Sequence, residues 1–234
     1  MPNLYICLTA DALEKEPTCP VTVVVDIFRA SSTIVTALAH GASAVVPIGE
    51  LTEWENLEGE SDVLLAGERE GKKLPQADFD NSPLSFQGDS IVNKRIALTT
   101  TNGTRAIRAI QETETILVGS FLNFSTIVQT IRHQEKDTLL VCAGWKGQPS
   151  LEDTYWSGAL LNALLPGYQP ANDGALMAQA VHHAHSGHMV SFLKNGSHYK
   201  RLAELGKQQD IQYCLSLDRH PIVPLMNGYQ IILR

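Results

Sequence analysis

The feature that most constrains the fold is the run at 21–25, which reads Val-Thr-Val-Val-Val. β-branched side chains favour extended backbone. A nearly continuous run of this kind, without polar alternation, is typical of a strand that is buried on both faces. The run therefore predicts a strand inside a sheet that helices cover on both sides.

Short apolar runs of this type alternate with helix-like segments along the chain. We expect further strands at 44–47, 63–67, 95–99, 115–119 and 138–142, and helices at 31–40, 51–57, 103–111, 123–134 and 151–165. The remainder is expected to be helical to about residue 215, with short strands near 222–225 and 230–233. Repeated β-α-β order predicts an α/β fold with a mainly parallel sheet between two helical layers.

The length of the chain is sufficient for one substantial core. A folded chain of 234 residues buries about 70% of the surface that its unfolded form exposes. We expect a single domain over residues 1–234, and an α/β core at 1–150 with a helical part at 151–234 packed on it is the alternative. The sequence leaves a homodimer open.

Charge and cysteine content exclude several classes of protein. The chain has 18 Lys and Arg against 25 Asp and Glu, a net charge of −7, which argues against nucleic-acid binding through a broad basic surface. No apolar run is long enough to span a membrane, and no leader sequence is visible at the N-terminus. The four scattered cysteines form no C-x-x-C pair, so we expect reduced thiols in a cytoplasmic protein.

Polar side chains follow the predicted strands, and ligands of such sheets usually bind beyond the carboxyl ends of the strands. These residues are Asp26 and Arg29, Glu68 and Arg69, the run Thr99 to Arg105, Ser120, and the run Gly144 to Gly147 followed by Glu152 and Asp153. Their shared position predicts a site at one edge of the sheet.

Four of these residues are carboxylates that could hold magnesium. They are Asp26, Glu68, Glu152 and Asp153. A carboxylate at the end of a buried strand is costly unless it is paired or bound to a metal, and Mg²⁺ prefers carboxylate and phosphate oxygens. Two alternatives stay open. Asp26 could pair with Arg29 or cap a helix. Glu152 and Asp153 fall in the first turn of a predicted helix, where the helix dipole favours acidic side chains.

Two hydroxyl-rich helix starts are candidate anion sites. They are Ser31-Ser32-Thr33 and Thr101-Asn102-Gly103-Thr104, with Arg29, Arg69 and Arg105 close to them in the sequence. Helix starts offer free N–H groups to phosphate or sulfonate, and arginine binds such oxyanions bidentately. Ordinary helix capping is the competing interpretation.

Two other features attract a chemical interpretation but lack support. The histidines at 182, 183, 185 and 188 have no acidic residue near them in the sequence to orient a metal-bound imidazole. Cys142 ends a predicted strand, but no histidine is placed convincingly beside it, so we expect a buried thiol.

Several blocks of the sequence, taken together, resemble the 2-phosphosulfolactate phosphatase family. They are 25–33 (VDIFRASST), 65–69 (LAGER), 80–83 (DNSP), 99–105 (TTTNGTR), 119–123 (GSFLN), 142–147 (CAGWKG) with 151–153 (LED), and more weakly 217–224. They occur in order across nearly the whole chain. One departure is the loop Glu68-Arg69-Glu70-Gly71, where the resemblance leads us to expect a more glycine-rich run.

The resemblance implies a magnesium-dependent phosphatase with an α/β/α fold of its own type. The family reaction releases phosphate from 2-phospho-3-sulfolactate and leaves sulfolactate, a step in coenzyme M synthesis. The substrate is a small polyanion that carries phosphate, carboxylate and sulfonate. Since a family can be wider than one pathway, the reaction type is better specified than the physiological substrate.

These considerations give a hypothesis for the site. Mg²⁺ bridges Asp26 and one or more of the other carboxylates to the phosphate, and the catalytic residues are Asp26, Arg29, Glu68 and Asp153. The remaining candidates bind substrate: Ser31, Ser32 and Thr33 with Arg29 at the phosphate, Thr101, Asn102, Gly103, Thr104 and Arg105 at the acid end, and also Arg69, Asn81 and Ser120.

Three alternatives to this hypothesis remain. Asp26 could be a covalent nucleophile, although Phe28 stands where the haloacid-dehalogenase pattern has a second Asp. The substrate could be another small phosphorylated acid. The chain could also be a non-catalytic anion-binding module, but clustered carboxylates would repel an anion unless a cation intervened.

Overall fold

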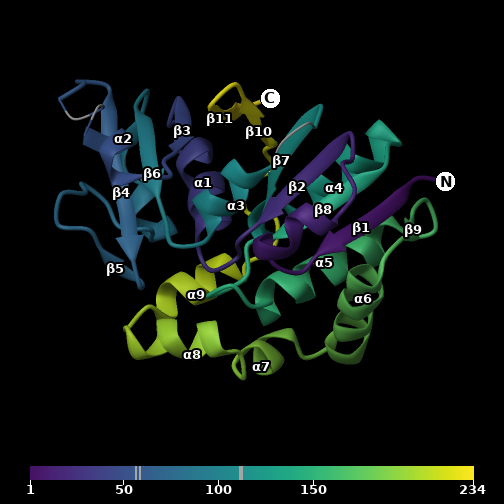
Figure 1. The fold of residues 1–234 in the computed structure, drawn as a ribbon. Helices are drawn as coiled ribbons and strands as arrows, with labels where there is room; N and C mark the ends of the chain where they lie inside the picture. Colours follow the sequence, from purple (N-terminus) through teal and green to yellow (C-terminus); the bar gives the residue numbers. More distant parts are fainter. Residues whose placement is uncertain (56, 58, 111–112) are drawn as a thin grey trace.

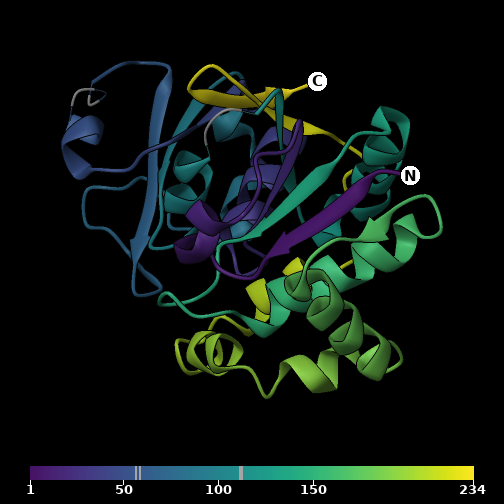
Figure 2. The same cartoon turned by 45° about the vertical axis from the view of Figure 1, so that its right-hand side comes forward.

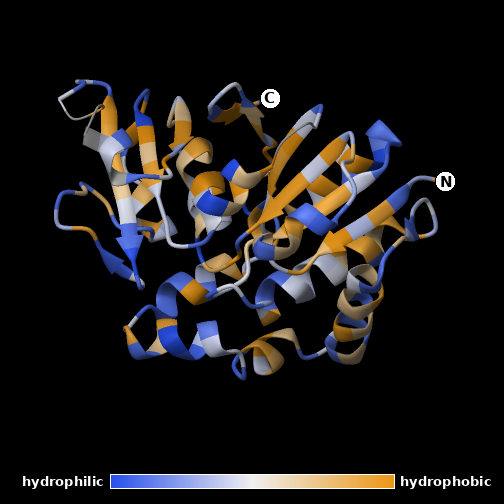
Figure 3. Ribbon diagram, in the orientation of Figure 1, coloured by the Kyte–Doolittle hydropathy of each residue, from blue (hydrophilic) through white to orange (hydrophobic). Residues whose placement is uncertain are grey.

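The apolar run at 21–25 forms strand β2 (Val21–Val25) at the heart of the sheet, as expected, and every residue of it is buried. The structure is a computed structural model that describes residues 1–55, 57, 59–110 and 113–234. Side chains on one side of β2, such as Val23, join one hydrophobic cluster, whereas Val24 joins another on the opposite face. The unbroken apolar pattern therefore reflects burial on both faces. Figure 3 shows the central strands as largely hydrophobic.

The sheet contains two groups of parallel strands. The first group is β4 (Val63–Arg69), β6 (Arg95–Thr99) and β3 (Ala44–Pro47), and the second is β7 (Thr115–Gly119), β2, β8 (Thr138–Cys142), β1 (Asn3–Cys7) and β9 (Gln169–Pro170). A short antiparallel strand, β5 (Lys72–Lys73), pairs with β4. The six long strands after β1 match the predicted ones, whereas β1 was not predicted.

An antiparallel hairpin joins the two groups. Its strands β10 (Pro224–Asn227) and β11 (Gln230–Leu233) insert between β3 and β7. The sequence predicts both strands, with the first shifted by two residues. Their place in the middle of the sheet follows from no local signal, because it depends on pairing with strands more than 100 residues away.

Helices cover both faces of the sheet and give the predicted three layers. Helices α1 (Ala30–Ala39) and α3 (Gly103–Ala109) contribute to one hydrophobic cluster, and α4 (Phe124–Gln134), α5 (Leu151–Leu164) and α6 (Asp173–His185) contribute to the other. Helix α2 spans Leu51–Glu55. The expected ends of the helices at 51–57 and 103–111 involve residues 56 and 111, which lie outside the described part of the chain.

The last helices lie along one side of the molecule, opposite the β10–β11 hairpin (Figures 1 and 2). They are α7 (Met189–Leu193), α8 (Ser197–Glu204) and α9 (Gln208–Cys214). Short 3-10 turns occur at η1 (Ala10–Lys15), η2 (Pro83–Phe86), η3 (Asp89–Ile91) and η4 (Phe121–Asn123). In the part of the chain that is described, no helix combines the length and the apolar character needed to cross a membrane.

Helices α5 and α6 approach each other closely at Gly158. A methyl group at Gly158 would lie 2.0 Å from the carbonyl oxygen of Ala178. Helix propensity alone would make Gly158→Ala stabilising by up to about 1 kcal/mol. We expect instead a loss of about 1–3 kcal/mol in the free energy of unfolding, because the two helices must move apart.

The measurement is urea denaturation of the wild type and of two variants. Gly187→Ala is the matched control, since Gly187 is exposed and a methyl group there meets no atom within 4 Å. We expect it to change stability by less than about 0.5 kcal/mol. A Gly158→Ala protein as stable as the wild type would contradict the close packing of α5 on α6.

Candidate active site

A pocket of about 230 Å³ lies where strand ends from both groups of the sheet meet the last helices. Asp26 follows β2, Glu68 is the second-last residue of β4, Thr101 follows β6, and Trp145 follows β8; all four line the pocket. Helix α8 closes it with residues that include His198. The ends of β2, β4, β6 and β8 therefore converge on one site, as the sequence predicts. Strand β7 is the exception, because Ser120, which follows it, does not line the pocket.

The four predicted carboxylates are brought together beside this pocket. They are Asp26, Glu68, Glu152 and Asp153, each less than a tenth exposed. Burial is the main cause that raises the pKa of Asp26 to about 6; the charges of Glu152 and Glu68 add to the shift, and His198 opposes it. Burial, followed by the charges of Glu152 and Asp26, raises the pKa of Asp153 well above its usual range. The site is therefore a concentrated, desolvated acidic centre.

Two of the four carboxylates have both oxygens engaged by backbone amides. Glu68 accepts hydrogen bonds from the N–H groups of Gly71, at 2.7 Å, and of Thr101, at 2.8 Å. Asp153 accepts from the N–H groups of Ile27, at 2.9 Å, and of Gly144, at 3.2 Å. These acids fasten the loops around the pocket, and the amide donors offset part of their burial cost.

The other two carboxylates are less fully satisfied. Glu152 Oε1 lies 2.7 Å from His198 Nδ1, but its Oε2 atom is buried without a hydrogen-bond partner. Asp26 has the backbone N–H of Ala30 to stabilise its charged form. Gly103 packs against it so closely that a Cβ atom at 103 would lie 2.7 Å from Asp26 Oδ2. Buried acceptors left open in this way are the ones suited to a further positive group.

These carboxylates fit the simplest kind of magnesium site, in which the protein supplies one or two carboxylate ligands. Within residues 1–55, 57, 59–110 and 113–234, no group of three or more His, Cys, Asp or Glu side chains is arranged around a metal position. Mg²⁺, however, is commonly held by one or two carboxylates together with water and substrate phosphate. Among the four carboxylates, Asp26 and Glu152, through its unpartnered Oε2 atom, are the ones that remain as ligands for such an ion.

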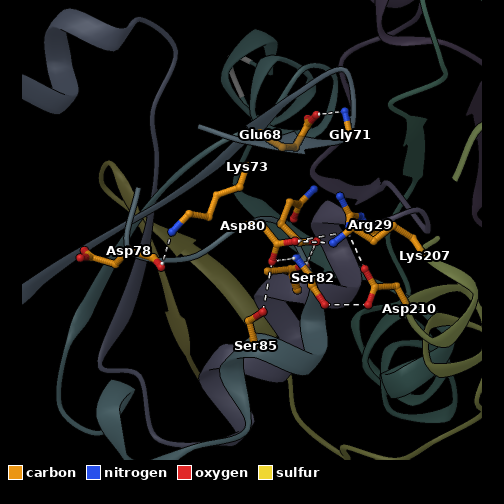
Figure 4. Close-up of polar contacts among 12 residues, drawn as sticks. Arg29, Glu68, Gly71, Lys73, Asp78, Asp80, Ser82, Ser85, Lys207 and Asp210 are labelled. Atoms are coloured by element: carbon orange, nitrogen blue, oxygen red, sulfur yellow. Dashed lines mark hydrogen bonds and ion pairs between the residues drawn. The ribbon is translucent and has the colours of Figure 1, made fainter. Parts of the chain in front are cut away.

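Arg29 is almost fully buried, and its acidic partner is Asp210 of helix α9 rather than Asp26. Arg29 Nη1 donates to Asp210 Oδ2 at 2.5 Å, and Ser82 donates to the other oxygen of Asp210 at 2.6 Å. Asp80, 4.0 Å from Arg29, is bound in turn by Lys207 at 2.8 Å (Figure 4). This buried network fixes the guanidinium at the wall of the pocket.

The helix start at 31–33 does not form the anion site that its hydroxyls suggest. Ser31 accepts from the N–H of Asp26, Ser32 donates to the carbonyl of Ile27, and Thr33 donates to the carbonyl of Asn81. All three side chains are buried and none lines the pocket. Ordinary helix capping, the competing interpretation, does not account for them either, because helix α1 has no side-chain cap; the hydroxyls instead bind backbone groups of neighbouring segments.

The second helix start is divided between structure and pocket. Thr100 and Thr104 bind each other through reciprocal contacts between hydroxyl and N–H, each of 3.1 Å. Gly103 packs on Asp26, as described above. Only Thr101 and Asn102 line the pocket. Asn81 also lines it, and its Oδ1 atom is buried without a partner.

Three predicted substrate ligands lie elsewhere. Arg69 donates to its neighbour's carbonyl and to the hydroxyl of Thr99, and Arg105 pairs with Asp11 on the surface. Both arginines line an adjoining depression, which shares Thr101 with the pocket. Ser120 caps the turn η4 and is fully buried. Sequence proximity to a strand end was the reason for choosing them, and side-chain direction takes them away from the pocket.

Sequence reasoning missed several residues of the pocket wall, among them Trp145, Lys146, His198 and Arg201. The first two lie in the turn after β8, which the sequence marked only as a polar strand end. The other two lie on α8. No local signal could reveal them, because His198 is 46 residues from the Glu152 that it contacts.

Cys142 and the histidine cluster take no part in the site. The Cys142 thiol is buried, and desolvation raises its pKa well above the usual range, so it is a poor nucleophile. All four cysteines are free and buried. His183 contacts Asn162, and His185 stacks on Phe192, so the ring contacts of the cluster are with packing partners.

Comparison with known proteins agrees with the resemblance seen in the sequence. The family model described as 2-phosphosulpholactate phosphatase matches residues 7–228. A protein from Thermotoga petrophila is 41% identical over 215 residues, 92% of each chain, and one from Clostridium acetobutylicum is 36% identical over 98% of this chain and 100% of its own. Another from Caldanaerobacter subterraneus is 38% identical over 88% of each chain. All three are named probable 2-phosphosulfolactate phosphatase.

The raised pKa of Asp26 predicts how the metal-free protein responds to pH. Because the native pKa is about 6, against 3.8 for an ordinary aspartate, the unfolded state loses this proton first as the pH rises. The free energy of unfolding should therefore fall between about pH 4 and pH 6, by up to about 3 kcal/mol for this group.

Asp26→Asn cannot ionise and should lack this loss. We expect the variant to be more stable than the wild type at pH 8 and to differ less at pH 4, as measured by chemical denaturation in buffer with a chelator. A stability difference that is the same at both pH values would contradict the shifted ionisation of Asp26.

Proposed function

The chain belongs to the 2-phosphosulpholactate phosphatase family, and from this premise we propose that it hydrolyses 2-phospho-3-sulfolactate to sulfolactate and phosphate. The observation that carries the proposal is the buried acidic centre at a pocket that also contains Arg29, Lys146 and Arg201. An acidic centre alone would repel a phosphate ester. Acids beside cations can instead hold a bridging metal ion next to a bound polyanion.

We propose that the resident cofactor is Mg²⁺ and that Asp26 and Glu152 hold it. When bound, such an ion neutralises charge on the phosphate and polarises its oxygens. Glu68 and Asp153 support this site from their amide-bonded positions, because they add negative potential and fix the surrounding loops.

The protein's own groups bind and orient the phosphate. Arg29 is fixed by Asp210, so its position at the pocket wall is preorganised for a phosphate oxygen. Asn81 and Asn102 are further polar side chains at the same wall. In the reaction a water molecule attacks phosphorus, the bond to the C2 oxygen of sulfolactate breaks, and that oxygen takes up a proton.

We propose that the reaction is a biosynthetic step of the coenzyme M type, because the proposed substrate is 2-phospho-3-sulfolactate. We also propose a cytoplasmic location, because the four scattered cysteines form no C-x-x-C pair. The alternative is that the chain is a phosphatase for another small phosphorylated acid, which would use the same acidic centre. Phosphate release from a panel of phosphorylated acids distinguishes the two, since the proposed substrate should give the highest kcat/KM.

Removal of the proposed metal or of its ligand should abolish turnover. We expect the wild type to lose activity in EDTA and to regain it with Mg²⁺. We expect Asp26→Asn and Glu152→Gln each to lower kcat at least about 100-fold, a barrier increase of about 3 kcal/mol. The measurement is release of inorganic phosphate from 2-phosphosulfolactate at several Mg²⁺ concentrations.

Glu14→Gln is a suitable control, because Glu14 is exposed in η1 and lines a depression that shares no residue with the pocket. It should leave kcat unchanged. Activity of Asp26→Asn within tenfold of the wild type would remove Asp26 from the mechanism. Tight binding of the substrate without any phosphate release would favour the anion-binding module instead.

A further inference from the structure

Two cationic side chains at the pocket, Lys146 and Arg201, have no acidic partner within 4.0 Å among the described residues. The third strong cation of the pocket, Arg29, differs because Asp210 neutralises it at 2.5 Å. Lys146 and Arg201 therefore contribute the uncompensated positive charge that faces the cavity.

The position of Lys146 is set by a stacked arrangement. Its Nζ atom lies 4.8 Å from the centre of the Trp145 ring. The Trp145 ring stacks on His198 with centroids 5.4 Å apart and an interplanar angle of 13°, and His198 is bonded to Glu152. A cation held over an indole in this way loses little further freedom when it binds an anion.

The backbone around Lys146 is also specialised. Lys146 has φ +53°, and its neighbours Gly144 and Gly147 have φ +70° and +73°. Positive φ is uncommon for a residue with a Cβ atom. The turn is closed by paired hydrogen bonds between Trp145 and Gln148, of 2.8 and 3.1 Å. The turn therefore holds Lys146 in an unfavourable backbone conformation that places its side chain over the Trp145 ring beside the pocket.

Arg201 comes to the pocket from α8, three residues after His198 and on the same face of that helix. The helix is anchored beneath it, because Leu202 is buried and Tyr199 makes an edge contact with Phe28 at 6.2 Å between ring centres. The guanidinium is therefore presented by a fixed helix, on a wall made by a different part of the chain from Asp26.

We propose that Lys146 and Arg201 bind the acid end of the substrate, its carboxylate and sulfonate, while the phosphate lies at Asp26 and Arg29. The inference rests on the proposed function and gives the acid end to these residues in place of Arg105, which pairs with Asp11 outside the pocket. Guanidinium binds carboxylate or sulfonate bidentately, and the ammonium acts as a point charge. The pocket therefore selects phosphate esters that carry a second anionic group.

The test separates binding of the acid end from hydrolysis. The variants are Arg201→Gln and Lys146→Gln, with Lys200→Gln as the matched control, since Lys200 is an exposed neighbour on α8 that does not line the pocket. One measurement is the affinity for sulfolactate by calorimetry, which requires no turnover. The other is kcat/KM for 2-phosphosulfolactate and for phenyl phosphate, which lacks a second anionic group.

We expect each variant to weaken sulfolactate binding about tenfold, the loss of one charge-assisted contact of about 1.4 kcal/mol, and to lower kcat/KM for 2-phosphosulfolactate similarly. Phenyl phosphate hydrolysis should change less than threefold, and Lys200→Gln should change nothing. Unchanged sulfolactate affinity in both variants, or equal losses on both substrates, would overturn the inference. A wild type that binds sulfolactate through these residues but releases no phosphate would support the inference and reject the proposed function.

Discussion

Burial of four carboxylates in one small volume is the constraint on which the rest of this site depends. Each charge that is taken out of water is costly, and like charges add to that cost. The fold meets the cost unevenly: backbone amides satisfy Glu68 and Asp153, and an imidazole reaches Glu152. The part of the cost that these contacts do not offset is seen in the raised pKa values of Asp26 and Asp153. An acidic centre held in this state is suited to a positive partner.

The last three helices complete the site that the strand ends begin. Helix α9 supplies Asp210, which neutralises the buried Arg29, and α8 supplies His198 and Arg201 to the pocket wall. Lys207 ties the same region to Asp80 in the loop after β5 (Figure 4). The charge of the pocket is therefore arranged by contacts between segments more than 100 residues apart, and the helical end of the chain is part of the site.

The sequence predicted the acidic centre better than the anion-binding groups, and the reason is physical. Asp26 follows a strand that must be buried on both faces, so its position at the sheet edge is fixed by that burial. The hydroxyls at 31–33, in contrast, can cap a helix or bind a ligand, and the local sequence is the same in both cases. Arg105 likewise has a flexible side chain whose direction is decided by Asp11, 94 residues away.

Local sequence specifies the alternation of strands and helices, the burial of β2 on both faces, and the polar residues at the strand ends, because hydrophobic periodicity and backbone propensity act over a few neighbouring residues. Which of those residues face the pocket depends on the tertiary fold. It inserted the β10–β11 hairpin between the two strand groups, and it brought α8 and α9 over the strand ends. Long-range strand pairing and side-chain direction set these features, and neither can be predicted from a short stretch of sequence.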